Sequence, residues 1–324
     1  MAKVTVNIRN FKGAYAHLNG EQSIEVSRRA ILRASLTLGF QDYGGYLASK
    51  PRLRTHRYLS GLTALNCLNQ VAGNWVLDDF FEDLDGSEKN PESYGHGMIF
   101  AKLVAERFLG VPWLAHVDDM KKKGLLKTTA TTRERGDMGG RCNQGHWHVI
   151  EAKGRSSSYP SKVVEDAKHQ AACVKSVTKK KPRTNSACIV SLWTDPIDVL
   201  LDDPPAEGAT SWDFEESDFW KHYYGNLAAY IRDAPQEAPF PTIFEDYVFT
   251  SLSPFLEELS PEVRKAFSPL PEIIGLPRKI VSDPAAAGEL FEGRPLEEFS
   301  QIAPDGVALL GPFGRVERLS RPEM

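Results

Sequence analysis

The sequence predicts an α/β protein whose central region has the order helix, strand, strand, helix, strand. Three observations lead to this class. Apolar residues recur at helical spacing before residue 110, two short segments separated by turn residues lie between 135 and 153, and an apolar, β-branched run occupies 187–193. Hydrophobic residues make up 41% of the chain and charged residues 25%, which is typical of a globular protein with a packed core.

Composition divides the chain of 324 residues into three regions. Residues 1–92 are expected to form a strand followed by helices, and residues 93–195 the α/β core. Residues 196–324 form an acidic, mixed region with amphipathic helices, and they hold 16 of the 21 prolines. Acidic residues alternate there with Phe, Leu, Ile and Trp, which argues against full disorder.

In the first region, Met1–Lys12 alternates apolar and polar residues and predicts a strand. It lacks the continuous apolar run of a signal peptide. Ser23–Leu38 and Ser60–Val76 have helical patterns. The acidic stretch Asp78–Glu92 contains glycine and proline and predicts a loop.

The core is expected to begin with a helix over His96–Leu109. Arg135–Arg141 and His146–Lys153 follow as two strands joined by a turn. A second helix runs from Pro160 to Val174, because proline is favoured at the start of a helix. The apolar run Ala187–Trp193 suits a strand that is covered on both faces.

The third region is expected to contain two amphipathic helices. Trp212–Arg232 has aromatic residues at helical spacing, and Phe255–Phe267 has a similar pattern.

Charge is unevenly distributed along the chain. Lys/Arg and Asp/Glu number 13 and 13 in residues 1–120, 16 and 5 in residues 121–183, and 10 and 25 in residues 184–324, so the net charges are 0, +11 and −15. A basic block of this size indicates a polyanion-binding surface, although a solvated lysine-rich face has the same composition. One hypothesis is that the acidic region folds back over the basic block or docks a partner.

The four cysteines are scattered and form no CxxC pair, so neither a disulfide framework nor a four-cysteine zinc site is expected. No apolar run approaches the length that spans a bilayer. We therefore expect a cytoplasmic protein with reduced cysteines and no membrane partner.

Three residues in the core carry a pattern suited to catalysis. Glu151 and Lys153 are two positions apart on a predicted strand, so their side chains point to the same face. If Asp137 lies on the adjacent strand of a hairpin, its carboxylate meets Glu151 across the ladder. Two clustered carboxylates bind a hard cation such as Mg²⁺, and without a cation they would repel each other.

This grouping suits phosphodiester hydrolysis. A metal ion held by Asp137 and Glu151 neutralises the phosphate and lowers the pKa of a bound water. Lys153 can orient that water or stabilise the developing negative charge. A plain exposed strand pair with a turn aspartate is the alternative interpretation.

Gly136-Asp137 with Glu151-Ala152-Lys153 resembles the PD-(D/E)XK nuclease superfamily, which has the restriction-endonuclease-like fold. Gly136 stands where the motif's name has proline. The resemblance covers about residues 93–195 and implies an αβββαβ core, for which Leu114–Val117 is the candidate missing strand.

The resemblance also implies further site residues and a cofactor. Glu106 on the preceding helix is expected to be a third metal-binding carboxylate, and Gln170 on the following helix is expected to face the site. Lys168, Arg155 and Arg141 are expected to bind nucleic acid. The implied cofactor is Mg²⁺, for which Mn²⁺ can substitute.

The resemblance thus implies a metal-dependent nuclease that hydrolyses DNA, in the manner of a bacterial restriction or anti-phage defence effector. A DNA repair or recombination nuclease, and a non-catalytic nucleic-acid-binding subunit of a larger defence complex, are the alternatives. A homodimer or a protein partner is compatible with each of these functions. The choice between DNA and RNA, and between single and double strands, stays open at this point.

Other residues permit competing interpretations. His146 and His148 near Cys142 have a spacing that suits a metal such as Zn²⁺, although surface or interface positions that face away from Glu151 are favoured. Asp118 and Asp119 are alternatives to Glu106 as the extra acid, or residues of a solvated turn. The segment 179–183 either binds a nucleic-acid backbone or keeps a helix end soluble.

Overall fold

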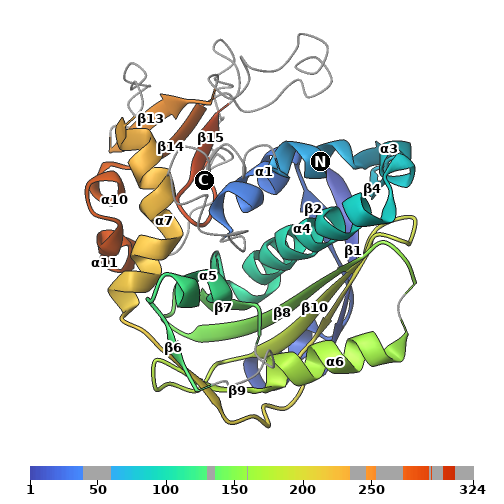
Figure 1. Cartoon of the computed structure of the whole chain (residues 1–324), viewed down its shortest axis with the longest axis horizontal. Helices are drawn as coiled ribbons and strands as arrows, with labels where there is room; N and C mark the ends of the chain where they lie inside the picture. Colours follow the sequence, from blue (N-terminus) through green and yellow to red (C-terminus); the bar gives the residue numbers. More distant parts are fainter. Residues whose placement is uncertain are drawn as a thin grey trace, which may run out of the picture.

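A computed structural model describes residues 1–38, 60–129, 136–158, 160–233, 246–252, 273–291, 293 and 302–310. Its main feature is a nine-stranded mixed sheet with the order β3-β4-β1-β11-β10-β8-β7-β5, in which β2 pairs with β1 (Figure 1). The strands are β1 (Ala2–Arg9), β2 (Gly20–Val26), β3 (Leu68–Val71), β4 (Asn74–Leu77), β5 (Trp113–His116), β7 (Met138–Arg141), β8 (Trp147–Arg155), β10 (Asn185–Ser191) and β11 (Asp198–Asp202).

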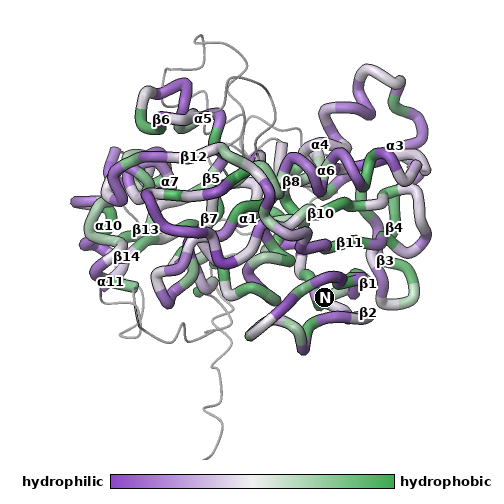
Figure 2. The backbone as a smooth tube through the Cα atoms, turned by 90° about the horizontal axis from the view of Figure 1, so that it is seen from below, coloured by the Kyte–Doolittle hydropathy of each residue, from purple (hydrophilic) through white to green (hydrophobic). Residues whose placement is uncertain are grey.

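Hydrophobic patterning explains where these strands lie in the sheet. Strand β1 alternates buried and exposed residues, whereas every residue of β10 is buried. Figure 2 shows hydrophobic and hydrophilic residues alternating along β1. Alternating burial is typical of a strand with one face toward solvent, and complete burial is typical of a strand covered on both faces. The prediction of a strand over 187–193 is therefore confirmed, with bounds shifted by two residues.

Helices α4 (Gly86–Val104) and α6 (Ser161–Ala172) cover opposite faces of this sheet (Figure 1). Ala187 and Ile189 of β10 pack with Ala167 of α6. The alternate residues Cys188 and Val190 belong to the large core that includes α4. Strand alternation thus assigns one face of β10 to each helix.

In the central region, the strands of the main sheet and the two helices that cover it occur in the order α4, β5, β7, β8, α6, β10, with short elements of the periphery between them. Strands β5, β7 and β8 are antiparallel neighbours, and β8 runs parallel to β10. The candidate strand at Leu114–Val117 is confirmed as β5, one residue earlier than expected. An α/β protein with a large mixed sheet is therefore present.

Two predictions in the first region are wrong in part. Helix α1 (Arg28–Thr37) occupies only the second half of 23–38, because β2 pairs with β1 over the first half. The predicted helix at 60–76 is helical only to residue 66 and then forms the hairpin β3–β4. In this hairpin, buried Trp75 donates through Nε1 to the carbonyl oxygen of Val26 at 3.0 Å.

The predicted loop at 78–92 contains α3 (Asp79–Asp83) and the start of α4, so that prediction is wrong. The Asp85 carboxylate accepts from the backbone N–H groups of Ser87 and Glu88, and the Glu88 side chain accepts from the Asp85 N–H. This capping box starts the helix despite Gly86 and Pro91 in its first two turns. Helix α4 continues into a π turn, η3 (Ala105–Leu109), which ends at Gly110 with φ 64°.

Two three-stranded sheets flank the main one. The amphipathic helix predicted at 212–232 is confirmed as α7 (Glu216–Asp233), which begins four residues later than expected. The predicted helix at 255–267 lies outside the described residues. Within the described part of the chain, no helix is long and apolar enough to cross a membrane. The remaining elements are β6 (Lys127–Thr128), β9 (Val174–Val177), β12 (Thr210–Asp213), β13 (Tyr247–Ser251), β14 (Ile273–Pro277), β15 (Ala308–Leu310), η1 (Gly13–Leu18), α5 (Val117–Lys122), α10 (Arg278–Ser282), η5 (Pro284–Ala286) and α11 (Ala287–Phe291).

The main sheet takes strands from all three regions that composition separates, because β1 and β11 lie beside β10. The acidic region also touches the basic block, since β12 pairs with β6 on one side and β9 on the other.

Candidate functional site

The hairpin of β7 and β8 brings Asp137 and Glu151 together, as the spacing predicts. Met138 pairs with Ile150, so the preceding Asp137 lies opposite Glu151. The backbone N–H of Ala152 donates to Asp137 Oδ2 at 3.2 Å. On its other side the Asp137 carbonyl accepts from the Val117 N–H at 2.9 Å, which joins it to the end of β5.

Lys153 forms an ion pair with Glu151, as expected for residues on the same face of one strand. The Glu151 side chain is only 1% exposed, whereas that of Lys153 is 32% exposed. The lysine therefore reaches from the buried carboxylate toward solvent.

Burial dominates the electrostatics of this cluster. It raises the pKa of Glu151 to about 8, with a further contribution from the Asp137 charge, and it raises the pKa of Asp137. Burial alone would lower the pKa of Lys153, but Glu151 and Asp137 raise it above its usual value. When both carboxylates are ionised they outnumber the single ammonium group, so a cation placed between them would favour their charged forms.

A cleft of about 230 Å³ opens beside these residues. Helix α4 forms one wall of it through Asn90, Ser93 and Tyr94. The opposite wall consists of Asp137 and the end of β8, from Ala152 to Ser157. Asp137 and Lys153 thus line a space that is open to solvent, whereas the buried Glu151 is not part of its lining.

Two glycines allow α4 to lie directly on β8 at this point. A Cβ atom on Gly154 would lie 1.6 Å from the Ser93 carbonyl oxygen, and one on Gly97 would lie 2.4 Å from the Gly154 nitrogen. Any larger residue at either position would therefore separate the helix from the strand. This close contact places the α4 wall next to Lys153.

The structure adds three residues that the sequence interpretation missed. Tyr94 Oη lies 2.9 Å from His116 Nε2, and His116 interacts electrostatically with Asp137. Asp166 of α6 is an electrostatic neighbour of Lys153. These residues come from α4, the end of β5 and α6, so no local spacing in the sequence could have grouped them.

Glu106 is not part of this site, which corrects the expectation of a third metal-binding carboxylate. It follows Gly97 by nine residues, or about 13 Å along the helix axis. Its carboxylate pairs with Arg33 at 2.8 Å, and its other charged neighbours are Lys102 and Asp305. Among the residues that the structure describes, no group of three or more His, Cys, Asp or Glu side chains is arranged to hold a metal ion.

Arg141 is also placed away from the cleft, so the geometry does not support its predicted contact with nucleic acid. It lies at the far end of β7, where its guanidinium is 2.9 Å from Glu216 Oε1 and stacks over the Trp147 ring at 5.1 Å. Its side chain is 4% exposed, which leaves little surface for a ligand.

The remaining predicted residues lie on α6 or at the end of β8. Gln170 follows Asp166 by one helical turn, so the two share a side of α6. Its Oε1 atom is buried and accepts no hydrogen bond from the described residues. Lys168 pairs with Glu165 at 3.2 Å on the exposed part of α6, whereas Arg155 lines the cleft.

The zinc alternative at His146 and His148 finds no support in the geometry. His148 is fully buried and hydrogen-bonds through Nδ1 to Thr184 Oγ1 at 2.9 Å, so the expected surface position is wrong for this residue. Burial lowers its pKa to about 3, which keeps the ring neutral. Asp119 pairs with Lys123 at 2.8 Å and is likewise engaged outside the cleft.

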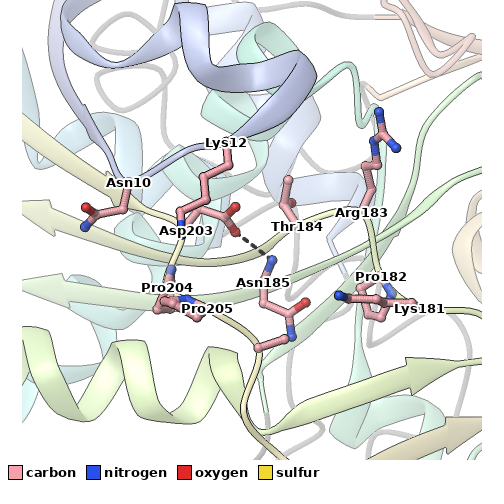
Figure 3. A pocket seen from close by; sticks show the side chains of 11 residues that line it. Asn10, Lys12, Lys181, Pro182, Arg183, Thr184, Asn185, Asp203, Pro204 and Pro205 are labelled. Atoms are coloured by element: carbon pink, nitrogen blue, oxygen red, sulfur yellow. Dashed lines mark hydrogen bonds between the residues drawn. The ribbon is translucent and has the colours of Figure 1, made fainter.

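A second cavity, of about 130 Å³, lies at the opposite end of the sheet, where β10 begins (Figure 3). Lys12, Lys181 and Arg183 line it, together with Asp203 and Asn185. The Asn185 N–H donates to Asp203 Oδ1 at 2.8 Å. The basic residues at 181 and 183 therefore surround a cavity remote from Lys153.

No family model matches the chain, and no curated protein or solved structure matches it either. The geometry of the residues therefore carries the inference of function.

Proposed function

We propose that this protein is a metal-dependent nuclease that hydrolyses phosphodiester bonds of DNA, with Asp137, Glu151 and Lys153 at its active site. The observation that carries the proposal is the meeting of two carboxylates and a lysine across the β7–β8 hairpin, beside an open cleft. A structural ion pair with Lys153 needs only one carboxylate, and a second carboxylate nearby would repel the first.

The order and pairing of the central elements support the proposal. Helix α4, three antiparallel strands, helix α6 and a strand parallel to β8 follow the αβββαβ order that the resemblance to PD-(D/E)XK nucleases implies. A role in restriction or anti-phage defence, as opposed to DNA repair, rests on that resemblance alone.

The residues present fit a magnesium ion. Mg²⁺ is commonly bound through one or two carboxylates together with waters and substrate phosphate oxygens, so a third acid is not required. Glu151 Oε2 is buried without a hydrogen-bond partner among the described residues, which makes it available as a ligand. When bound, Mg²⁺ or Mn²⁺ would neutralise the phosphate and lower the pKa of a coordinated water.

The protein's own groups have separable roles. Hydrogen bonds donated by the backbone N–H groups of Ala152 and Val117 fix the position of Asp137 at the start of β7. Lys153 stays protonated beside the two carboxylates, so it can donate to a phosphate oxygen as negative charge develops. Arg155 extends the positive charge along the cleft.

The test compares cleavage of plasmid and linear DNA by wild type, Glu151→Ala and Lys153→Ala in Mg²⁺ or Mn²⁺. We expect metal-dependent cutting in wild type and a loss of about 100-fold or more in each variant. Glu165→Ala is the matched control, because Glu165 is an exposed carboxylate on α6 whose side chain is 68% exposed. Cutting that survives both substitutions would refute the assignment. DNA binding without cutting by the wild type would favour the non-catalytic alternative.

A further inference from the structure

One tryptophan is exposed to solvent. Trp193 is 62% exposed, whereas the other five tryptophans are each 3% exposed or less. An isolated exposed apolar residue is common on protein surfaces, so its position relative to the cleft decides whether it matters.

Trp193 emerges beside the rim of the cleft. Strand β10 ends at Ser191, which pairs in register with Arg155 at the end of β8. The next residue, Leu192, donates its backbone N–H to the Arg155 carbonyl oxygen at 2.8 Å. Trp193 follows at one further Cα step of about 3.8 Å. Because β8 and β10 are parallel neighbours, Arg155 and Trp193 lie at the same end of the sheet.

Arg155 supplies a donor at this rim. It lines the cleft together with Asp137 and Lys153. Its Nε atom is buried and has no hydrogen-bond partner in the part of the chain that the structure describes. A guanidinium with an unused donor is suited to bind the oxygens of a phosphate.

We infer that Arg155 and Trp193 form a binding subsite for one unpaired nucleotide of DNA. In this subsite Arg155 contacts the phosphate and Trp193 stacks on the base. The inference rests on the proposed nuclease function and gives it a substrate class. Bases inside a duplex are stacked on their neighbours, so an indole can cover a base only where the strand is single or locally opened.

The subsite therefore favours a single strand or an unpaired end. Base stacking on aromatic side chains tolerates any base, so sequence preference at this position is expected to be weak.

Because Trp193 is the exposed tryptophan of the six, acrylamide quenching of fluorescence reports on it selectively. The probes are an oligothymidylate of about 12 nucleotides, within the range of known single-strand sites, and its duplex with oligoadenylate. Binding is measured in a metal chelator, so that the DNA is not cut. We expect the single strand to protect wild type from quenching and the duplex to protect it much less. Trp193→Phe identifies the fraction of the signal that Trp193 contributes.

Affinity provides the second readout. Trp193→Ala is expected to weaken binding of the single strand by roughly 5- to 150-fold, whereas Trp193→Phe keeps most of the affinity. Phe80→Ala, which removes a 40% exposed aromatic residue outside the cleft lining, is the control and should bind like wild type. Unchanged affinity in Trp193→Ala, equal protection by the duplex, or no binding of the single strand by wild type would each overturn the subsite.

These outcomes separate the subsite from the proposed function. A protein that binds the single strand through Trp193 but cuts no DNA in Mg²⁺ retains the subsite and refutes the nuclease. A protein that cuts DNA equally well with and without Trp193, and binds it equally well, retains the nuclease and refutes the subsite.

Discussion

Burial changes the chemistry of otherwise ordinary carboxylates in this protein. A pair of acids at an exposed strand end would repel each other only weakly, because water screens their charges. Glu151 is 1% exposed, and burial raises its pKa together with that of Asp137. Lys153 favours the charged form of both acids, and a cation bound between them, as proposed above, would favour it further.

Acid is expected to destabilise the fold through His148. Burial lowers the pKa of this residue to about 3, whereas in an unfolded chain it titrates near about 6.5. Between these values the unfolded state binds more protons. The contribution of His148 to the free energy of unfolding is therefore fully present above about pH 6.5, and it falls as the pH drops toward about 3, by about 1.4 kcal/mol per pH unit for this one proton.

Urea unfolding at a series of pH values measures this slope. His148→Asn retains a polar group near Thr184 and removes the titration, so its slope should be smaller than that of wild type. Other groups contribute to the slope of both proteins: burial lowers the pKa of His96 and His116, which adds slope of the same sign, and raises the pKa of Glu92 and Glu151, which adds slope of the opposite sign. Equal slopes in wild type and His148→Asn would contradict the prediction.

At the scale of elements, the crossing of α4 over β8 determines the shape of the cleft. The contact depends on the lack of side chains at Gly97 and Gly154, which lets backbone meet backbone. Three cleft residues of α4 precede Gly97 by seven residues or fewer, so a small shift of the helix would displace them from Lys153.

Two glycines on α4 should respond in opposite directions to the same substitution. Gly97→Ala places a methyl group against the backbone of Gly154, so we expect a loss of about 1–3 kcal/mol in stability and reduced cleavage. Gly95→Ala meets no atom within 4 Å and should gain up to about 1 kcal/mol from helix propensity. Thermal and urea unfolding of both variants test this, and a similar loss in both would contradict it.

The sequence patterns predicted the central elements better than the N-terminal ones. Strand β10 and helix α7 have strong local patterns, which their burial in the fold reinforces. The hairpin β3–β4 was mistaken for helix, because its apolar residues also fit a helical period. The start of α4 was missed because Gly86 and Pro91 outweighed the capping box at Asp85.

At the scale of the whole molecule, a buried ionic cluster joins segments far apart in sequence. Asp305 Oδ2 lies 2.9 Å from Arg33 Nη1 of α1 and 3.4 Å from Lys102 Nζ of α4. It also accepts a hydrogen bond from Tyr223 of α7 at 2.7 Å. The segment 302–310 is thus attached to both the N-terminal and the central regions.

Asp305→Asn is expected to be strongly destabilising. The substitution leaves Arg33 and Lys102 buried without their shared counter-charge, at a cost of about 3–5 kcal/mol. The control is Glu289→Gln, which breaks a surface pair with Lys279 whose side chains are 80% and 55% exposed, and it should change stability by about 0.5 kcal/mol or less. Urea unfolding midpoints of the two variants test the contrast. A small effect at Asp305 would show that the cluster adds little to stability.

The amino-acid pattern alone predicts the α/β class, the hairpin that joins Asp137 to Glu151, and the side that Lys153 shares with Glu151. The hairpin and the shared side follow from strand alternation over a short span, so local spacing is enough to predict them. The three-dimensional packing is needed to see that Glu106 and Arg141 pair with other residues, and that Tyr94, His116, Asp166 and Trp193 lie near the site. These placements depend on how separate elements pack, because the charge that a buried residue meets comes from distant parts of the chain.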